Sequence, residues 1–248
     1  RELAILVAAI NHHLAKPAVE RRLSADAAPA IVLPAMSPPR AVWLEPHEET
    51  ELLLACFRGP RAASLADAEA SVDTLPRVYV FTMLGLETAA RQGAIRGLTV
   101  DRVNLAAGFV DYREPGRAET KKRRAIVPIS DRLRPVIERA VRETAGRHVL
   151  GDSGQIKRAF KTACRVAARR LSEAGHHDSA RKLATQVTPH VLRHTYATMA
   201  LRHGVTLWDV AGVLGDTVET VRAVYGHHSP EHLRRAVNYR ENKELVYG

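Results

Sequence analysis

Residues that could react with a phosphate ester gather in one helical pattern late in the chain. His190 and Arg193 are three residues apart, and His194 follows four residues after His190. On a helix, this spacing places imidazole and guanidinium groups on one face. A guanidinium binds phosphate through paired hydrogen bonds and an imidazole can accept a proton, so the set suits reaction at phosphorus. Pro189 suits the first turn of such a helix, and Thr188 can cap it.

Two further helical patterns follow and lead to a tyrosine. We expect a turn at Gly204, a second helix over 207–214, a break at Gly215-Asp216 and a third segment that ends at Tyr225. A tyrosine hydroxyl there could act as a nucleophile if a neighbouring group took its proton. The first helix carries an apolar set that can face a core: Leu192, Tyr196, Met199 and Ala200.

The order and spacing of these residues resemble those of the tyrosine recombinases, the phage-integrase family. The family signature is His-x-x-Arg, then a Leu-Gly-His box, then a nucleophilic Tyr nine residues after the last His. His190 and Arg193 match the first part, and Leu214-Gly215 match the second. Tyr225 lies nine residues after position 216, which is Asp rather than His. The resemblance places Asp216 in the catalytic set, where the family's His donates a hydrogen bond to a phosphate oxygen.

The resemblance also implies an earlier catalytic arginine and a reaction. Arg91 fits the family's first arginine box, and Ala94 stands where the family has Glu or Asp. Arg91 and Arg193 would stabilise negative charge on the phosphate in the transition state, with no metal and no cofactor. Tyr225 would attack to form a covalent 3′-phosphotyrosine, with His190 as its base. The bond energy kept in that intermediate would let DNA strands be resealed without ATP.

A hairpin between the two arginines is expected to supply the acid. Short β-strand patterns at 108–112 and 125–127 flank a basic run. In the family, a lysine on such a hairpin protonates the leaving oxygen. Lys121 is the candidate, and Lys122 is the alternative because hairpin length varies.

The segment 154–171 has an apolar face and a basic face without an acidic residue. An exposed helix normally mixes charges of both signs, so this pattern favours a helix that follows DNA phosphates. Lys122, Arg123 and Arg124 on the hairpin are expected to hold phosphates as well. The cations of the helix are Lys157, Arg158, Lys161, Arg165 and Arg169.

Composition is consistent with a nucleic-acid partner. The 248 residues carry a net charge of +10, which favours a polyanion such as double-stranded DNA. Cys56 and Cys164 lie in apolar contexts and are interpreted as buried thiols. His176-His177-Asp178, in a polar loop, lack the spacing of metal ligands, so no metal site is expected. With no signal-peptide pattern and no membrane-spanning apolar run, we expect a cytoplasmic protein encoded by a bacterium or phage.

The chain divides into three regions by pattern. Residues 1–14 are amphipathic and resemble the last helix of the DNA-clamping domain that precedes the catalytic domain in this family. Four prolines between 29 and 39 mark a linker. We therefore expect a remnant of a clamping domain over 1–28, a linker over 29–40 and a catalytic domain over 41–248. Because the chain begins at Arg1 without Met, we expect it to lack an upstream segment.

The catalytic domain is predicted to be mainly α with a small antiparallel β-sheet, an α+β fold. Further helical patterns cover 45–57, 75–86 and 130–144, the last with Ser130 as its N-cap. The tail over 230–243 is another helix candidate, which would pack either on a neighbouring protomer or on its own domain.

The leading hypothesis is a site-specific DNA recombinase that works as a homo-oligomer on DNA, a tetramer by resemblance, and is monomeric in isolation. A type IB topoisomerase would share the chemistry, but the clamping-helix remnant favours the integrase. The alternative from another class is a catalytically weakened or silent DNA-binding relic, because of Ala94 and Asp216.

Overall fold

The chain divides into two units, residues 1–40 and residues 41–248. In the first unit, helix α1 (Glu2–Leu14) matches the predicted helix, but none of its residues is buried and Leu3 and Leu6 are exposed. Two 3-10 turns follow it, over Ala18–Glu20 and Ala25–Ala27. The computed structural model describes residues 2–20, 22, 24–29, 31, 42–116, 123–151 and 156–226.

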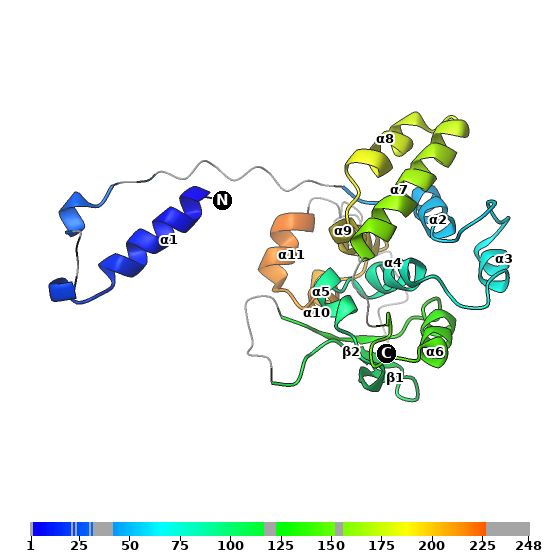
Figure 1. Cartoon of the computed structure of the whole chain (residues 1–248), viewed down its shortest axis with the longest axis horizontal. Helices are drawn as coiled ribbons and strands as arrows, with labels where there is room; N and C mark the ends of the chain where they lie inside the picture. Colours follow the sequence, from blue (N-terminus) through cyan, green and yellow to red (C-terminus); the bar gives the residue numbers. More distant parts are fainter. Residues whose placement is uncertain are drawn as a thin grey trace, which may run out of the picture. The chain divides into compact units, whose positions relative to one another are not determined.

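The second unit is mainly helical and carries a small antiparallel sheet (Figure 1). This confirms the predicted α+β class. Its described strands follow the order β1-β2-β3, with β1 at Val103–Asn104, β2 at Phe109–Asp111 and β3 at Ile126–Pro128. A 3-10 turn at Val100–Arg102 leads into β1. The helices are α2 (Pro46–Leu54), α3 (Leu65–Ala70), α4 (Arg77–Thr88), α5 (Gln92–Arg96), α6 (Arg134–Glu143), α7 (Ile156–Glu173), α8 (His177–Thr185), α9 (Pro189–Arg202), α10 (Leu207–Leu214) and α11 (Val218–Tyr225).

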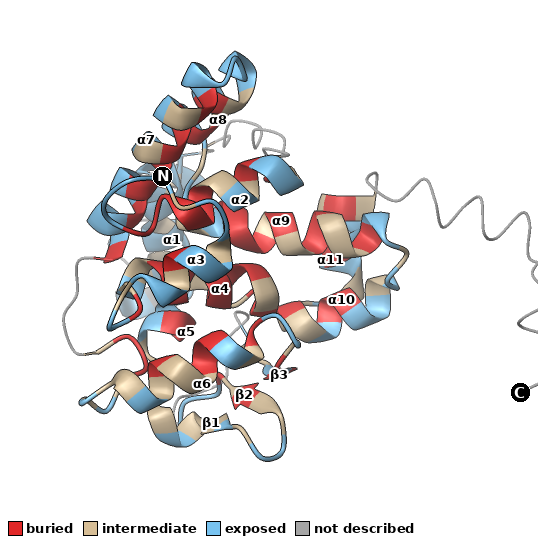
Figure 2. Ribbon diagram, turned by 90° about the vertical axis from the view of Figure 1, so that its right-hand side faces the viewer, coloured by how far each residue is buried: buried red, intermediate tan, exposed pale blue. Residues whose placement is uncertain are grey.

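Helix α9 links two hydrophobic clusters. Helix α4 packs against both α7 and α9, and α8 lies alongside α7. Buried residues run along α4 and α9 in Figure 2. Apolar side chains of α2, α4 and α7 build the larger cluster, which Leu192 joins from the start of α9. The second cluster joins the rest of α9 to α10 and α11 through Leu201, Val210, Val221 and Tyr225. The tyrosine is therefore held by packing between three helices.

The predicted apolar face of α9 is only part of its buried surface. Leu192 is buried as expected, whereas Tyr196 is partly exposed. The polar residue Thr195 is buried as well, because its hydroxyl accepts a hydrogen bond from Leu44 N and donates one to Val191 O, each at 2.9 Å. A buried hydroxyl with both roles filled costs little. Helix α9 is therefore a central helix rather than a surface helix with one apolar stripe.

Two predicted helix bounds were wrong. Helix α2 ends at Leu54 rather than Phe57. Helix α6 begins at Arg134 rather than after Ser130. Ser130 lies in the preceding turn, where its hydroxyl oxygen accepts a hydrogen bond from Leu133 N at 3.2 Å. The side chain does cap a turn, but the helix begins later.

Other predictions failed at short polar elements. Residues 176–178 were expected in a loop, but His176 is the N-cap of α8 and His177 begins it. Helix α3 was not predicted. Thr188 occupies the N-cap position of α9 without a side-chain capping bond. The predicted tail helix over 230–243 lies outside the described residues. No helix in the described part of the chain has both the length and the hydropathy of a transmembrane span.

Candidate active site

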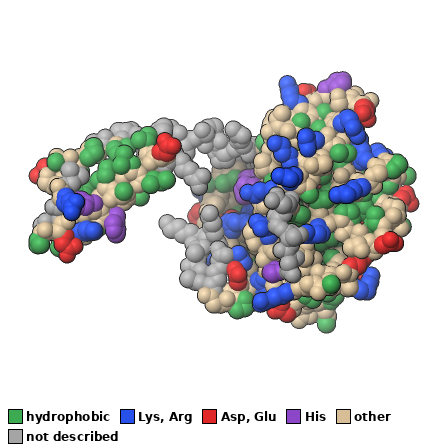
Figure 3. Space-filling model, viewed as in Figure 1, with side chains coloured by type: hydrophobic (Ala, Val, Ile, Leu, Met, Phe, Trp, Pro, Cys, Tyr) green, Lys and Arg blue, Asp and Glu red, His purple; other side chains and the backbone are tan. Residues whose placement is uncertain are grey.

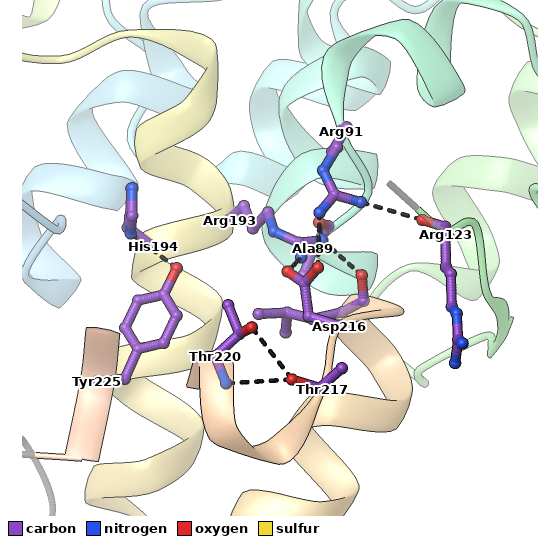
Figure 4. A network of polar contacts seen from close by, with 10 residues as sticks. Ala89, Arg91, Arg123, Arg193, His194, Asp216, Thr217, Thr220 and Tyr225 are labelled. Atoms are coloured by element: carbon purple, nitrogen blue, oxygen red, sulfur yellow. Dashed lines mark hydrogen bonds and ion pairs between the residues drawn. The ribbon is translucent and has the colours of Figure 1, made fainter. Parts of the chain in front are cut away.

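Arg193 joins the ends of two helices. Ala89 is the C-cap residue of α4 and Gly215 that of α10, and both adopt the left-handed conformation (φ 53° and 61°). Arg193, on α9, donates from Nη1 to Ala89 O at 2.9 Å and to Leu214 O at 2.8 Å (Figure 4). Its side chain is only 3% exposed. The carbonyl oxygens at a helix C-terminus carry partial negative charge, so they stabilise this buried cation.

Arg91 approaches the same point from the N-terminal end of α5. It is the N-cap residue of that helix and is partly exposed. Its Nη1 donates to Arg123 O at 3.0 Å, which ties it to the chain segment that leads into β3. Its Nη2 donates to Asp216 Oδ1 at 2.8 Å. Arg91 therefore connects α5, the turn between α10 and α11, and the hairpin arm, as we name the chain between β2 and β3 (residues 112–125).

The carboxylate of Asp216 lies between the two guanidiniums. Oδ1 accepts from Arg91 and Oδ2 accepts from Arg193 Nη2. The Asp216 N–H donates to Ala211 O at 3.1 Å after the left-handed Gly215, which fixes the backbone from which the carboxylate extends. The two arginines thus form an anion-binding site, and in this structure the anion is a side chain of the same chain.

Tyr225 contacts His194, for which the sequence predicted no individual catalytic role. It is the last residue of α11 and is buried. Its hydroxyl lies 2.8 Å from Nδ1 of His194, one turn beyond His190 on α9. The rings of His190 and His194 meet edge to face, with centroids 4.5 Å apart. The signal in the sequence was the four-residue spacing of the two histidines, but only the packing of α11 on α9 identifies which of them meets the tyrosine.

Burial in the protein disfavours the charged forms of Tyr225, His190 and His194. Burial raises the pKa of Tyr225 to about 12, although Arg193 and Arg91 oppose the rise. Burial, together with His190 and Arg193, lowers the pKa of His194 to about 4. The pKa of His190 is lowered by burial and by the two arginines. At neutral pH, the tyrosine is therefore a phenol and His194 is a neutral imidazole.

An open cleft of about 1040 Å³ brings most of the predicted catalytic residues together. Helix α7 contributes Lys157 and Lys161 to its wall. Figure 3 shows Lys and Arg side chains gathered around α7 on this face. The catalytic candidates that line the cleft are Arg91, His190, Arg193, Asp216 and Tyr225.

The remaining cations of α7 do not share this cleft. Arg158 and Arg169 line a separate cavity of about 940 Å³, together with apolar residues such as Phe57. Arg169 also lies 3.8 Å from Glu173, an acidic residue just beyond the predicted basic face. Arg165 is exposed. The predicted basic face is therefore divided between two flanks of the helix.

The hairpin arm is described only in part. Lys121 and Lys122, the candidates for the acid, lie outside the described residues. Arg123 contributes its carbonyl oxygen to Arg91, as noted above. Arg124 forms an ion pair with Glu114 at 3.1 Å and is mostly buried, which favours a structural contact over a phosphate contact.

Ala94 is buried on α5 beside a small cavity. The cavity has a volume of about 300 Å³, and Arg124 and Arg193 line it with Ala94. A longer acidic side chain at this position would extend toward these cations. In the described part of the chain, no three His, Cys, Asp or Glu side chains lie close enough to hold a metal ion.

Comparison with known proteins places the chain in one family. The model of the phage integrase family matches residues 46–232. The chain belongs to the phage integrase family. This confirms the resemblance seen in the order of His190, Arg193 and Tyr225, and the matched span contains every element that lines the cleft.

Two curated proteins and one solved structure are similar to this chain. Tyrosine recombinase XerD of Pseudomonas aeruginosa is 29% identical over 179 residues, which are 68% of this chain and 57% of that protein. Tyrosine recombinase XerA of Pyrococcus furiosus is 26% identical over 198 residues, covering 76% and 65%. The Tn1549 transposon integrase, solved with transposon right end DNA, has a TM-score of 0.59 at 16% identity, covering 96% and 75%. The chain thus spans less than two thirds of these curated relatives, and the structural likeness concerns the fold.

Proposed function

We propose that this chain is the catalytic part of a site-specific DNA recombinase, which cleaves and rejoins strands through a covalent 3′-phosphotyrosine. One observation carries the proposal: Arg91 and Arg193 converge on a single anion, the carboxylate of Asp216, in the cleft that Tyr225 lines. A phosphodiester bound to the same donors would lie beside the tyrosine. Membership of the phage integrase family supports the assignment.

The two guanidiniums are suited to the charge that develops in the reaction. As Tyr225 attacks phosphorus, negative charge grows on the non-bridging oxygens of the phosphate, and preorganised donors stabilise it most when water is excluded. Arg193 is held by two carbonyl oxygens and Arg91 by one, so neither needs to reorganise. The 3′ phosphate becomes joined to the Tyr225 oxygen, and the 5′ oxygen leaves.

The leaving 5′ oxygen needs a proton, for which Lys121 is the proposed donor and Lys122 the alternative. The hairpin arm supports this proposal, because Arg123, directly after these lysines, is bonded through its carbonyl oxygen to Arg91. The described residue next to the lysines is therefore held at Arg91. Resealing is the same reaction in reverse, with a 5′ hydroxyl attacking the phosphotyrosine.

Double-stranded DNA is the proposed partner and α7 the proposed contact helix. Lys157 and Lys161 line the cleft, so they are suited to the phosphates nearest the cleavage point. Arg123, Arg158, Arg165 and Arg169 are proposed to meet phosphates farther along the duplex. We also propose assembly as a tetramer on DNA in the cytoplasm of a bacterium, by analogy with the family.

A covalent-trapping experiment tests this function. Nicked duplexes from direct repeats flanking the gene would be incubated with the protein, so that the cleaved fragment diffuses away and the adduct accumulates. The parent chain should form a denaturation-resistant adduct, and Tyr225→Phe should form none while retaining DNA affinity. Tyr196→Phe, a matched change on α9, should form adduct at the parent rate. DNA binding without any adduct from the parent would instead support the DNA-binding relic.

A further inference from the structure

The Tyr225 hydroxyl has one hydrogen-bond partner among the described residues, and that partner is His194. Nδ1 of His194 lies 2.8 Å from the hydroxyl oxygen. His190, to which the base was assigned from the sequence, makes no hydrogen bond with Tyr225 among those described; it contacts the ring of His194 instead. His190 is the more exposed of the two histidines, and the ring of His194 contacts both the His190 ring and the Tyr225 ring.

We infer that His194, rather than His190, takes the proton of Tyr225 during strand cleavage. This inference rests on the proposed function and adds a catalytic residue to it. His190 is then free to contact the phosphate from the cleft, which both histidines line.

Packing fixes the contact between His194 and Tyr225. Both side chains come from helices joined by the second hydrophobic cluster, in which Ala197 and Leu201 of α9 meet Val221 of α11. The two rings also contact each other, with centroids 5.4 Å apart. The hydroxyl of a buried tyrosine has little freedom, because its position follows from the ring. The donor and acceptor are therefore already at the distance that proton transfer requires.

The protonation states also suit the transfer. Burial and the neighbouring cations keep His194 neutral at neutral pH. In the tautomer that carries its proton on Nε2, the imidazole offers a lone pair on Nδ1, and the tyrosine hydroxyl donates to it. His190 and Arg193 are the charged or titratable groups that disfavour an imidazolium at His194. Arg91 and Asp216 act on its two neighbours, His190 and Tyr225. A bound phosphodiester would add a further negative charge and so favour the imidazolium.

The step is balanced. The O–H bond of Tyr225 breaks and its proton moves to Nδ1 of His194. The phenolic oxygen forms a bond to phosphorus, and the bond from phosphorus to the 5′ oxygen breaks. The proposed hairpin lysine gives a proton to that oxygen. In the resealing direction, the imidazolium of His194 returns the proton to the phenolic oxygen as it leaves.

The test distinguishes removal of the proton from Tyr225 from donation of a proton to the leaving 5′ oxygen. Each variant would be assayed in single turnover on two nicked duplexes, one with the natural 5′ bridging oxygen and one with a 5′ bridging sulfur. A thiolate leaves without a proton, so the sulfur substrate makes the acid unnecessary but still requires the tyrosine to lose its proton. The variants are His194→Ala, His194→Asn and His190→Ala, with Tyr196→Phe as the control.

We expect His194→Ala to slow adduct formation by about a hundredfold or more on both substrates. His194→Asn offers an oxygen acceptor but no basic nitrogen, so it should hold the hydroxyl and remain nearly as slow. Its melting midpoint and DNA affinity should match the parent, which keeps the test valid if the Ala variant folds poorly. His190→Ala should lose less on the sulfur substrate than either His194 variant.

Three outcomes would overturn the inference. A near-parental rate for His194→Asn would show that the contact only positions the tyrosine. A defect that disappears on the sulfur substrate would assign His194 to the leaving oxygen. A larger loss of rate in His190→Ala than in the His194 variants on the sulfur substrate would identify His190 as the base. Absence of adduct from the parent chain is a different result, because it contradicts the proposed function itself.

Discussion

Asp216 accepts a hydrogen bond from Arg91 at 2.8 Å across 125 positions of sequence, and its second carboxylate oxygen bonds Arg193. The acidic residue at a position where the family has histidine therefore does not point away from the arginines. It occupies the donors that the proposed substrate requires. Cleavage of DNA would have to begin by exchanging one anion for another.

Replacing this carboxylate should speed cleavage. Asp216→His removes the competing anion and supplies a donor to the phosphate. Restoring one preorganised donor is worth on the order of a hundredfold in rate. Affinity should change little, since many phosphate contacts share it. Single-turnover adduct formation measures the effect. A His variant no faster than the parent would direct attention to Ala94, beside the small cavity lined by Arg193.

A sulfate titration supplies a control that needs no DNA. In the parent, Asp216 competes with sulfate for the two guanidiniums, whereas Asp216→His leaves them open. Sulfate should therefore raise the melting midpoint of the variant more than that of the parent. Asp178→His, at an exposed ion pair with Arg181 on α8, should respond to sulfate as the parent does.

The lysines on the cleft side of α7 should set the salt dependence of DNA binding. Lys157→Gln and Lys161→Gln should each flatten the slope of log affinity against log salt by roughly one unit, because each loses one phosphate contact. Arg181→Gln, an exposed cation on α8, is the matched control and should leave the slope unchanged. Unchanged slopes in both lysine variants would remove this face of α7 from the interface.

A side chain at Gly215 should destabilise the fold. Its φ of +61° lies in the left-handed region, and a Cβ would lie 3.2 Å from Arg123 O. Gly215→Ala should cost roughly 1–2 kcal/mol of unfolding free energy from the backbone conformation alone. Gly212→Ala, in the middle of α10 with open space around it, should be neutral or stabilising by up to about 1 kcal/mol. Urea unfolding of the pair measures the difference, and equal stabilities would contradict this account.

His194 should make the free energy of unfolding depend on pH. The pKa of His194 falls from its ordinary value of 6.5 to about 4 in the folded chain. Between these values, the unfolded state binds the extra proton, so the free energy of unfolding rises with pH. The contribution is complete above about pH 6.5 and is lost as the pH falls toward 4. His194→Asn should flatten this part of the profile, and His177→Asn, an exposed histidine, should not.

The sequence predicted the residues of the cleft better than their contacts. The numbers of residues between His190, Arg193 and Tyr225 indicated the family, because each of these residues has a set position along a helix. Which histidine meets Tyr225 depends on how α11 packs on α9, and a spacing along one helix does not contain that information. The partners of Asp216 lie on α5 and α9, far away in sequence.

Helices were predicted where apolar periodicity was long and were missed where it was short. Helix α10 was predicted over its full length because its apolar residues and Gly215 mark its course and its end. Helix α8 buries only Ala180 and Leu183, so its pattern resembles that of a polar loop. The late start of α6 follows from a turn closed by the Ser130 side chain, which the sequence does not distinguish from a helix cap.

Arg193 both holds helices together and belongs to the proposed catalytic set. Its guanidinium joins the C-terminal ends of α4 and α10 to α9 by hydrogen bonds. The inactivity of an Arg193 variant could therefore come either from the lost positive charge or from a weakened fold. A lysine there would keep the charge but offer only one nitrogen to several acceptors. Arg91 bonds one backbone carbonyl and its side chain is 29% exposed. The positive charge that faces the phosphate can therefore be changed at Arg91 while the fold stays intact. Mutational dissection of this protein should therefore begin at Arg91.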